Sequence, residues 1–209
     1  MPRVCGQIDQ AKSEAILDAA ADVLAERGLG ASISAIASRA GVSKQTIYNQ
    51  FGSKTELIHA LVARRVASVT APLRVPGAAE NPEETLTALA TTLIAIVTNA
   101  KAYALMRLTV QGAGAMPDLA RAVFEAGPSR TRALLAQFLK AETLAGRLDV
   151  ADPLEAAEMF AGMCAGHRQI RTLLGLDLGE DASEIDRLAR NIAQMFMRAF
   201  APAGSDKKA

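Results

Sequence analysis

The sequence is poor in the residues that carry metal, redox or disulfide chemistry. It has two cysteines, two histidines, no tryptophan and only 4 % aromatic residues in 209. A disulfide framework or a zinc site is therefore not expected, and we predict no cofactor and a reducing cytoplasmic location. No apolar run reaches the roughly 18 residues that a membrane span needs, and the N-terminus lacks a signal-peptide pattern, so no membrane association is expected.

The sequence also lacks an excess of charge of either sign, because it has 23 Lys and Arg and 22 Asp and Glu. What the chain has instead is 50 % hydrophobic residues, rich in Ala and Leu, with few β-branched runs between turns. This composition predicts an all-α fold, and capping and Pro/Gly signals divide the chain into nine or ten helices without strands. The first helix is expected from about Asp9 to Arg27, with an apolar stripe that includes Ile16, Ala20 and Val23 and an end at Gly28. Asn81-Pro82 and Pro128 are each expected to open a later helix, and the last helix is expected from Ser183.

One stretch, from Ser32 to Leu57, is far more specific than the rest. Ser32 and Ser43 are natural N-caps for two short helices that flank a turn at Gly41. Ser53 and Glu56 then form the S-x-x-E pattern of a capping box, which predicts the start of a further helix. Two short helices around a glycine turn are typical of a helix-turn-helix, the motif that places its second helix in the major groove of DNA.

The second of these helices has two distinct faces. Ile47 and Phe51 lie four residues apart and should face the core, so the opposite face carries polar groups suited to base edges and phosphates. Lys44 can donate to guanine, while Gln45 and Asn49 can each pair with adenine. Between Arg27 and Lys54 the charged residues are all basic, which favours phosphate. The predicted DNA-binding residues are Ser32, Ser43, Lys44, Gln45, Thr46, Tyr48, Asn49, Gln50 and Lys54. The alternative is an ordinary solvated polar helix whose serines only cap.

The pattern I-A-x-x-A-G-V-S-K-x-T-I-Y-x-x-F-x-S-K-x-E-L, from Ile36 to Leu57, resembles the N-terminal domain of the TetR family of transcriptional regulators. The resemblance covers residues 9–65, with the helix-turn-helix at 32–51. It implies a homodimer that binds a palindromic operator on double-stranded DNA, with a larger C-terminal domain that dimerises and holds a small effector. One departure is Gln45, where many members have a small residue.

The C-terminal domain is expected over residues 66–201, after a break marked by Pro72, Pro76 and Gly77. Small and apolar residues on the last two helices allow close approach of a second copy, which favours dimerisation, although these helices can instead pack inside their own subunit. Residues 1–8 and 202–209 are expected to be flexible tails.

An apolar or amphipathic effector would need an apolar pocket in this domain. The candidate lining residues are bulky, soft or polar: Tyr103, Met106, Phe124, Phe138, Met159, Met163 and His167. Most can equally be core residues, His167 can be an ordinary buried histidine, and a redox role for Cys164 is not favoured.

No enzyme motif competes with these features. The sequence has no Gly-rich phosphate loop, no Cys/His ligand pair and no G-x-S-x-G. The favoured hypothesis is therefore a repressor that a small effector releases from its operator, and the alternative is an effector-independent DNA-binding module or an activator.

Overall fold

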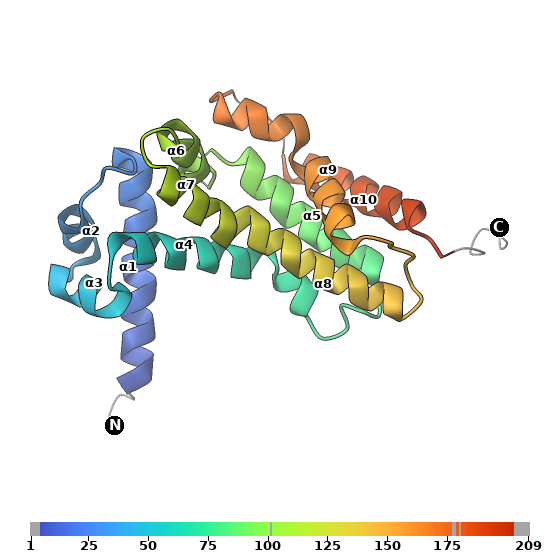
Figure 1. The fold of residues 1–209 in the computed structure, drawn as a ribbon, viewed down its shortest axis with the longest axis horizontal. Helices are drawn as coiled ribbons and strands as arrows, with labels where there is room; N and C mark the ends of the chain where they lie inside the picture. Colours follow the sequence, from blue (N-terminus) through green and yellow to red (C-terminus); the bar gives the residue numbers. More distant parts are fainter. Residues whose placement is uncertain (1–4, 101, 177–178, 180, 203–209) are drawn as a thin grey trace. The chain divides into compact units, whose positions relative to one another are not determined.

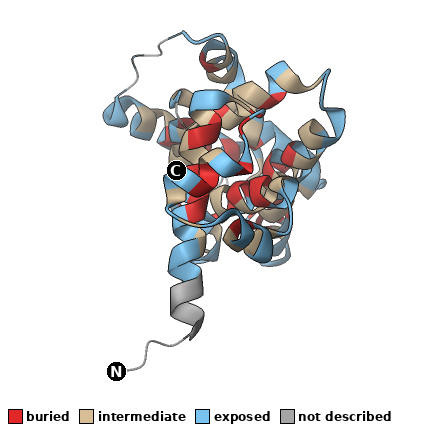
Figure 2. Cartoon of the chain, turned by 90° about the vertical axis from the view of Figure 1, so that its left-hand side faces the viewer, coloured by how far each residue is buried: buried red, intermediate tan, exposed pale blue. Residues whose placement is uncertain are grey.

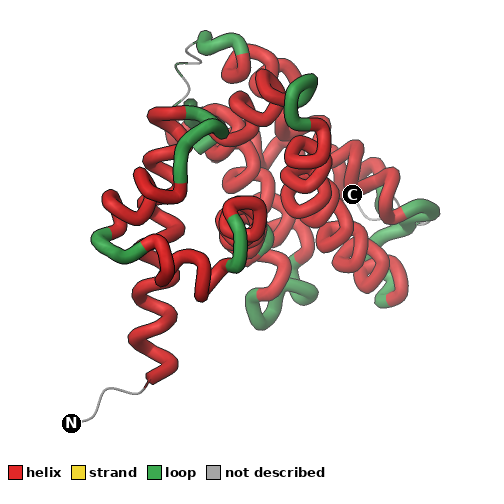
Figure 3. Tube along the Cα trace, turned by 60° about the vertical axis from the view of Figure 1, so that its left-hand side comes forward, coloured by secondary structure: helices red, strands yellow, loops and turns green. Residues whose placement is uncertain are grey.

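The computed structural model describes residues 5–100, 102–176, 179 and 181–202, with side chains from residue 10 onward. Helices and loops make up all of this part of the chain, which confirms the all-α prediction (Figure 3). None of the helices described is both long and apolar enough to cross a membrane. The α-helices are α1 (Cys5–Arg27), α2 (Ile33–Ala40), α3 (Lys44–Phe51), α4 (Lys54–Val69), α5 (Pro82–Thr98), α6 (Ala104–Gly112), α7 (Pro117–Phe124), α8 (Arg130–Leu144), α9 (Pro153–Leu173) and α10 (Ala182–Ala199).

These helices form two compact units. The head comprises the chain up to Arg65 together with Ala104–Gly127, and the body comprises Val66–Tyr103 and the chain from Pro128 onward. In this division α6 and α7, which lie within the expected C-terminal domain, belong to the head, and α6 contacts α1. The functional division into residues 9–65 and 66–201 stays a prediction.

The head is organised around the apolar stripe of α1. Ile16, Ala20 and Val23 are buried at helical spacing, as predicted, and Gly28 ends the helix with a φ of 76°. The helix begins at Cys5 rather than near Asp9, so part of the expected N-terminal tail is helical; residues 1–4 of that tail lie outside the described part. The side chain of Arg64 on α4 bridges two carboxylates of α1, and Figure 1 shows α1 to α4 together.

The body has one apolar core. Helix α5 packs against both α9 and α10, and α8 packs against α9. Phe160 of α9 and Phe196 of α10 are fully buried and meet edge to face, with ring centroids 5.2 Å apart. Figure 2 shows buried residues on the inward sides of the helices.

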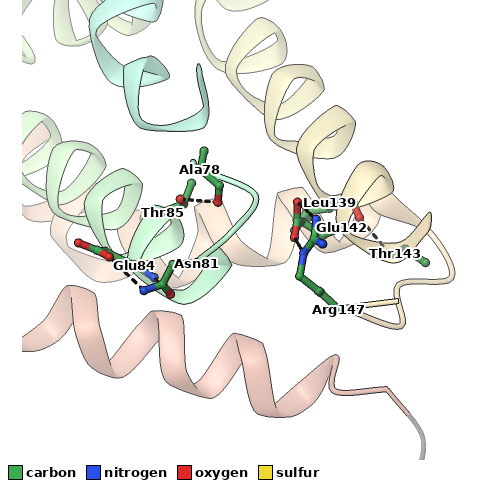
Figure 4. A network of polar contacts seen from close by, with 8 residues as sticks. All are labelled: Ala78, Asn81, Glu84, Thr85, Leu139, Glu142, Thr143 and Arg147. Atoms are coloured by element: carbon green, nitrogen blue, oxygen red, sulfur yellow. Dashed lines mark hydrogen bonds and ion pairs between the residues drawn. The ribbon is translucent and has the colours of Figure 1, made fainter. Parts of the chain in front are cut away.

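A buried carboxylate forms an ion pair at the C-terminal end of α8. The Glu142 side chain is 1 % exposed and accepts two hydrogen bonds from Arg147, at 2.5 and 3.1 Å (Figure 4). These bonds raise the pKa of the Arg147 guanidinium. At the start of α5, Asn81 caps Glu84 N at 3.2 Å, as the Asn81-Pro82 pattern predicted. The C-terminal end of α8 and the N-terminal end of α5 are thus both stabilised by side chains of the body.

Two local expectations require correction. Asp181 rather than Ser183 caps α10, through a capping box with Glu184. Pro128 does not open a new helix, since it lies in a π-helical turn, η2 (Glu125–Ser129), that joins α7 to α8. The break near Pro72 contains a 3₁₀ turn, η1 (Ala71–Arg74). Of the expected C-terminal tail, residues 203–209 lie outside the described part.

Helix α9 is interrupted, which the sequence pattern did not reveal. Gly166 has a φ of 40° and a ψ of −134°, so the backbone leaves the helical conformation there and resumes it immediately afterwards. This conformation is open to glycine and strained for other residues. The two halves of α9 are therefore separate helical segments joined at one residue.

Candidate nucleic-acid interface

The turn between α2 and α3 has the hydrogen bonds that its sequence predicts. Ser32 Oγ accepts from Ala35 N at 3.2 Å, and Ser43 Oγ accepts from Thr46 N at 3.0 Å. Gly41 adopts the left-handed conformation with a φ of 66°, and Val42 N donates to Ala37 O at 3.0 Å. Each short helix thus begins at a serine cap, and the turn between them is closed by backbone bonds.

Helix α3 is anchored by one face and exposes the other. Ile47 is fully buried and Phe51 is half-buried, whereas Tyr48 is 45 % exposed. The exposed face also carries Lys44, Gln45 and Asn49. An eight-residue helix is too short to be stable alone, so this anchoring and the caps determine where the polar face lies.

Two side-chain hydrogen bonds order the polar groups of α3. Ser43 Oγ and Thr46 Oγ1 are 2.9 Å apart at the first turn. From the first turn to the next, Gln45 Nε2 donates to Asn49 Oδ1 at 2.7 Å. Gln50 is half-buried and has a partner of its own. The predicted DNA-binding residues of α3 therefore include a coupled amide pair, which the i, i+4 spacing permits but the sequence reasoning did not identify.

Two of the basic residues near α3 are engaged by other groups of the head, so less positive charge is available there than the sequence suggests. Arg39 forms two hydrogen bonds, of 2.7 and 3.0 Å, to Glu26 at the end of α1. The same bonds raise the pKa of Arg39 and lower that of Glu26. Lys54 donates to the carbonyl oxygen of Leu29, and partial burial lowers the pKa of its ammonium group. Lys44, in contrast, is exposed at the start of α3. Its role as a DNA contact, like those of the other eight residues, stays a prediction.

The predicted effector-binding residues are divided between the two units. Met106 and Phe124 belong to the head, and Phe124 is exposed. In the body, Phe138 is a core residue, Met163 packs against that core, and Met159 and His167 are exposed. His167 is therefore not a buried histidine in the single chain. The seven residues stay a prediction as a ligand set.

Tyr103 is the best-defined of these positions. It is buried in the body, and its hydroxyl accepts a hydrogen bond from Gln169 Nε2 at 2.7 Å. Burial raises the pKa of the phenol. Gln169 follows the interruption of α9 and was missed by sequence reasoning, because no local pattern relates residues 66 positions apart.

Comparisons with known proteins agree with this geometry. Residues 16–61 match the family model for bacterial regulatory proteins of the TetR family, and residues 84–202 match the C-terminal domain of AefR-like transcriptional repressors. The chain belongs to the TetR family of transcriptional regulators. Family membership makes it a DNA-binding regulator and not an enzyme, and confirms the head as the unit that carries the helix-turn-helix.

Solved structures show the same fold over most of the chain. The flavonoid-responsive regulator FrrA is 31 % identical, with 93 % of this chain and all of that chain covered and a TM-score of 0.69. A TetR-family regulator from Mesorhizobium loti is 26 % identical, with 92 % and 98 % covered and a TM-score of 0.73. A TetR regulator from Agrobacterium tumefaciens, at 24 % identity, 92 % and 95 % coverage and a TM-score of 0.72, shares the fold. No relative is found among curated protein sequences.

Proposed function

We propose that this regulator is a homodimeric repressor that binds a palindromic operator through α3 and is released from it by a small apolar or amphipathic effector. The observation that carries the proposal is the exposed polar face of α3 opposite the buried Ile47. Lys44, Gln45 and Asn49 would contact base edges, and Tyr48 a phosphate. The N-termini of α2 and α3, capped by Ser32 and Ser43, suit further phosphate contacts.

Dimerisation is supported by the outward faces of the last two helices. Leu154, Met159 and Ile170 of α9 and Met195 of α10 each have more than half of their surface exposed in the single chain. Exposed large apolar residues on adjoining elements are typical of association surfaces. Two copies would place two recognition helices on one operator, where successive major grooves lie about 34–36 Å apart.

An effector response is supported by the relatives. Residues 84–202 match the C-terminal domain of a repressor family, and FrrA, at 31 % identity, is described as flavonoid-responsive. Helix α4 continues from the head into the body, so a ligand held in the body can act on the head through α4. A coupling free energy of about 1–3 kcal/mol between effector and DNA would change the affinity for the operator about five- to 150-fold.

The DNA-binding part is tested by selecting duplexes from a random-sequence pool with the full chain and titrating the selected sequence. We expect a palindrome, and an affinity that falls steeply as salt rises. A variant with Lys44→Ala and Tyr48→Ala should lose specific binding while its thermal unfolding is unchanged, and Lys140→Ala on α8 is the matched lysine control. Binding without any sequence preference at physiological salt would refute the repressor proposal.

The effector and the dimer are tested separately on the same protein. Sedimentation should give a dimer, and Met195→Glu should give monomers that bind one half-site weakly. Addition of a flavonoid should release the operator if this regulator shares the chemistry of FrrA. The alternative, an effector-independent module or activator, is favoured if a broad panel of apolar compounds neither releases DNA nor raises the unfolding temperature.

A further inference from the structure

The second segment of α9, residues 167–173, is held less firmly than the first, and Figure 1 shows the two segments running in different directions. The buried apolar residues of α9 all precede the interruption at Gly166 and belong to the core of the body: Ala156, Ala157, Phe160 and Cys164. Of the described residues of α9 after Gly166, only Thr172 is buried, and none belongs to that core. Segments with few buried apolar contacts open at a small cost in free energy. Residues 167–173 can therefore open while the first segment stays packed.

The buried residue of this segment has an unsatisfied hydroxyl. Thr172 is 4 % exposed, and its Oγ1 has no hydrogen-bond partner in the chain. A buried hydroxyl without a partner destabilises the folded state. Several threonines of the other described helices avoid this by donating to the carbonyl oxygen four residues earlier, at 2.8–3.0 Å: Thr87, Thr92, Thr98, Thr109 and Thr143. The hydroxyl of Thr172 is thus available to a group that the chain itself does not supply.

A polar contact joins the same segment to the rest of the body. The hydroxyl of Tyr103, which is buried, and the side-chain amide of Gln169 form a hydrogen bond of 2.7 Å. A phenol hydroxyl both donates and accepts, so this bond forms with either end of the amide. Gln169 and Thr172 lie three residues apart, which places them on one face of the helical segment. A phenol, an amide and a hydroxyl therefore lie close together.

We propose that the effector binds between this segment and the rest of the body, with Thr172 Oγ1 as its polar anchor and the Tyr103–Gln169 bond closing the segment before it binds. The inference rests on the proposed function, because it names the polar part of the proposed effector site. A hydroxyl pairs with another hydroxyl or with a carbonyl and needs no opposite charge. Arg168 and Arg171, which precede Thr172, already have interaction partners. The site therefore fits an uncharged compound that carries a hydroxyl or carbonyl group on an apolar body.

The anchor is tested with two compounds that differ by one hydroxyl, 2-naphthol and naphthalene. The chain has no tryptophan, so the fluorescence of either compound can be titrated directly with the full chain. The wild type should bind 2-naphthol more tightly than naphthalene by about two- to tenfold, as expected for one net hydrogen bond. Thr172→Val should abolish this difference, whereas Thr172→Ser, which keeps the hydroxyl, should retain it. Thr87→Val on α5 is the matched control and should bind both compounds as the wild type does.

Thermal unfolding of the same variants tests whether the hydroxyl lacks a partner before binding. Thr172→Val removes the unsatisfied oxygen and keeps the shape of the side chain. Without ligand, its unfolding temperature should therefore equal or exceed that of the wild type. A lower unfolding temperature would mean that the hydroxyl already has a partner in solution, which would overturn the anchor.

The closing bond is tested by hydrogen exchange on the full chain without ligand. Tyr103→Phe and Gln169→Ala remove the bond from its two sides, so each should speed amide exchange in residues 167–173 by about two- to tenfold. Gln137→Ala, at an exposed glutamine of α8, is the matched control and should leave this exchange unchanged. Unchanged exchange in both variants would refute the closed segment.

The outcomes separate this inference from the proposed function. If the wild type binds neither compound, or if Thr172→Val keeps the preference for 2-naphthol, the anchor is wrong even where the chain selects a palindrome. None of these measurements uses DNA. A chain that selects no operator but shows the expected preference would therefore refute the repressor proposal and leave the binding site in place.

Discussion

The head and the body differ in which side chains they expose and which they bury. The polar groups of α3 are exposed on an eight-residue helix that has one fully buried anchor, Ile47. The body buries long apolar faces of α5, α8, α9 and α10 around Phe160 and Phe196. Short helices gain little stability from propensity, so the head relies on caps and a few anchors, and its exposed residues are available to read DNA. Substitutions should therefore separate recognition from stability.

The largest effect is expected in the body core. Phe160→Ala should lower the free energy of unfolding by about 3–5 kcal/mol, because it removes a fully buried ring and leaves a cavity beside Phe196. Urea unfolding at fixed protein concentration measures the change. Leu144→Ala, which truncates an apolar residue that is 81 % exposed, is the control and should change it by less than about 0.5 kcal/mol. Equal effects of the two variants would contradict the assigned core.

Two glycines of α9 give the next largest contrast. A Cβ at either Gly162 or Gly166 would meet no atom within 4 Å, and only Gly166 has a positive φ. Gly166→Ala should therefore cost about 1–3 kcal/mol through backbone strain. Gly162→Ala should raise stability by about 0.5–1 kcal/mol, because alanine is the better helix former. If Gly166→Ala is also stabilising in thermal unfolding, α9 is continuous in solution and the interruption is not a stable feature.

What could be predicted from the sequence was local. The caps at Ser32, Ser43 and Asn81 and the buried stripe of α1 follow from residues a few positions apart, where the chain has few alternatives. The family pattern from Ile36 to Leu57 extended this to the function, since it combines the caps, the turn and both faces of α3. The same reasoning placed Phe51 and Ile47 toward the interior.

What could not be predicted depends on distant partners or on a backbone choice. The pairing of Arg39 with Glu26 and the bond from Lys54 to Leu29 bring together residues 13 and 25 positions apart. The packing of α6 and α7 with the head is likewise set by tertiary contacts. The interruption at Gly166 was hidden because an isolated glycine is compatible with a helical pattern.

A smaller effect on stability is expected from the buried Cys164 thiol at high pH. Burial raises the pKa of the Cys164 thiol from 9.0 to about 12. Above pH 9 the unfolded chain ionises this thiol while the folded chain keeps the proton, so stability falls as pH rises, by about 1 kcal/mol at pH 10. Urea unfolding between pH 8 and 10 should show a weaker pH dependence for Cys164→Ala than for the wild type. Identical slopes would mean that the thiol is accessible to water in the folded protein.

The smallest effect is expected at the surface of the head. Glu26→Gln removes the carboxylate that pairs with Arg39, which leaves an additional positive charge on the helix next to α3. Affinity for the selected operator should rise modestly at low salt, and the salt dependence should steepen by up to about one released counterion. Glu83→Gln makes the same change in net charge in the body and is the control. If both variants shift the salt dependence equally, the gain comes from net charge alone; a shift confined to Glu26→Gln would mean that the ion pair with Glu26 limits how strongly the head is attracted to phosphate.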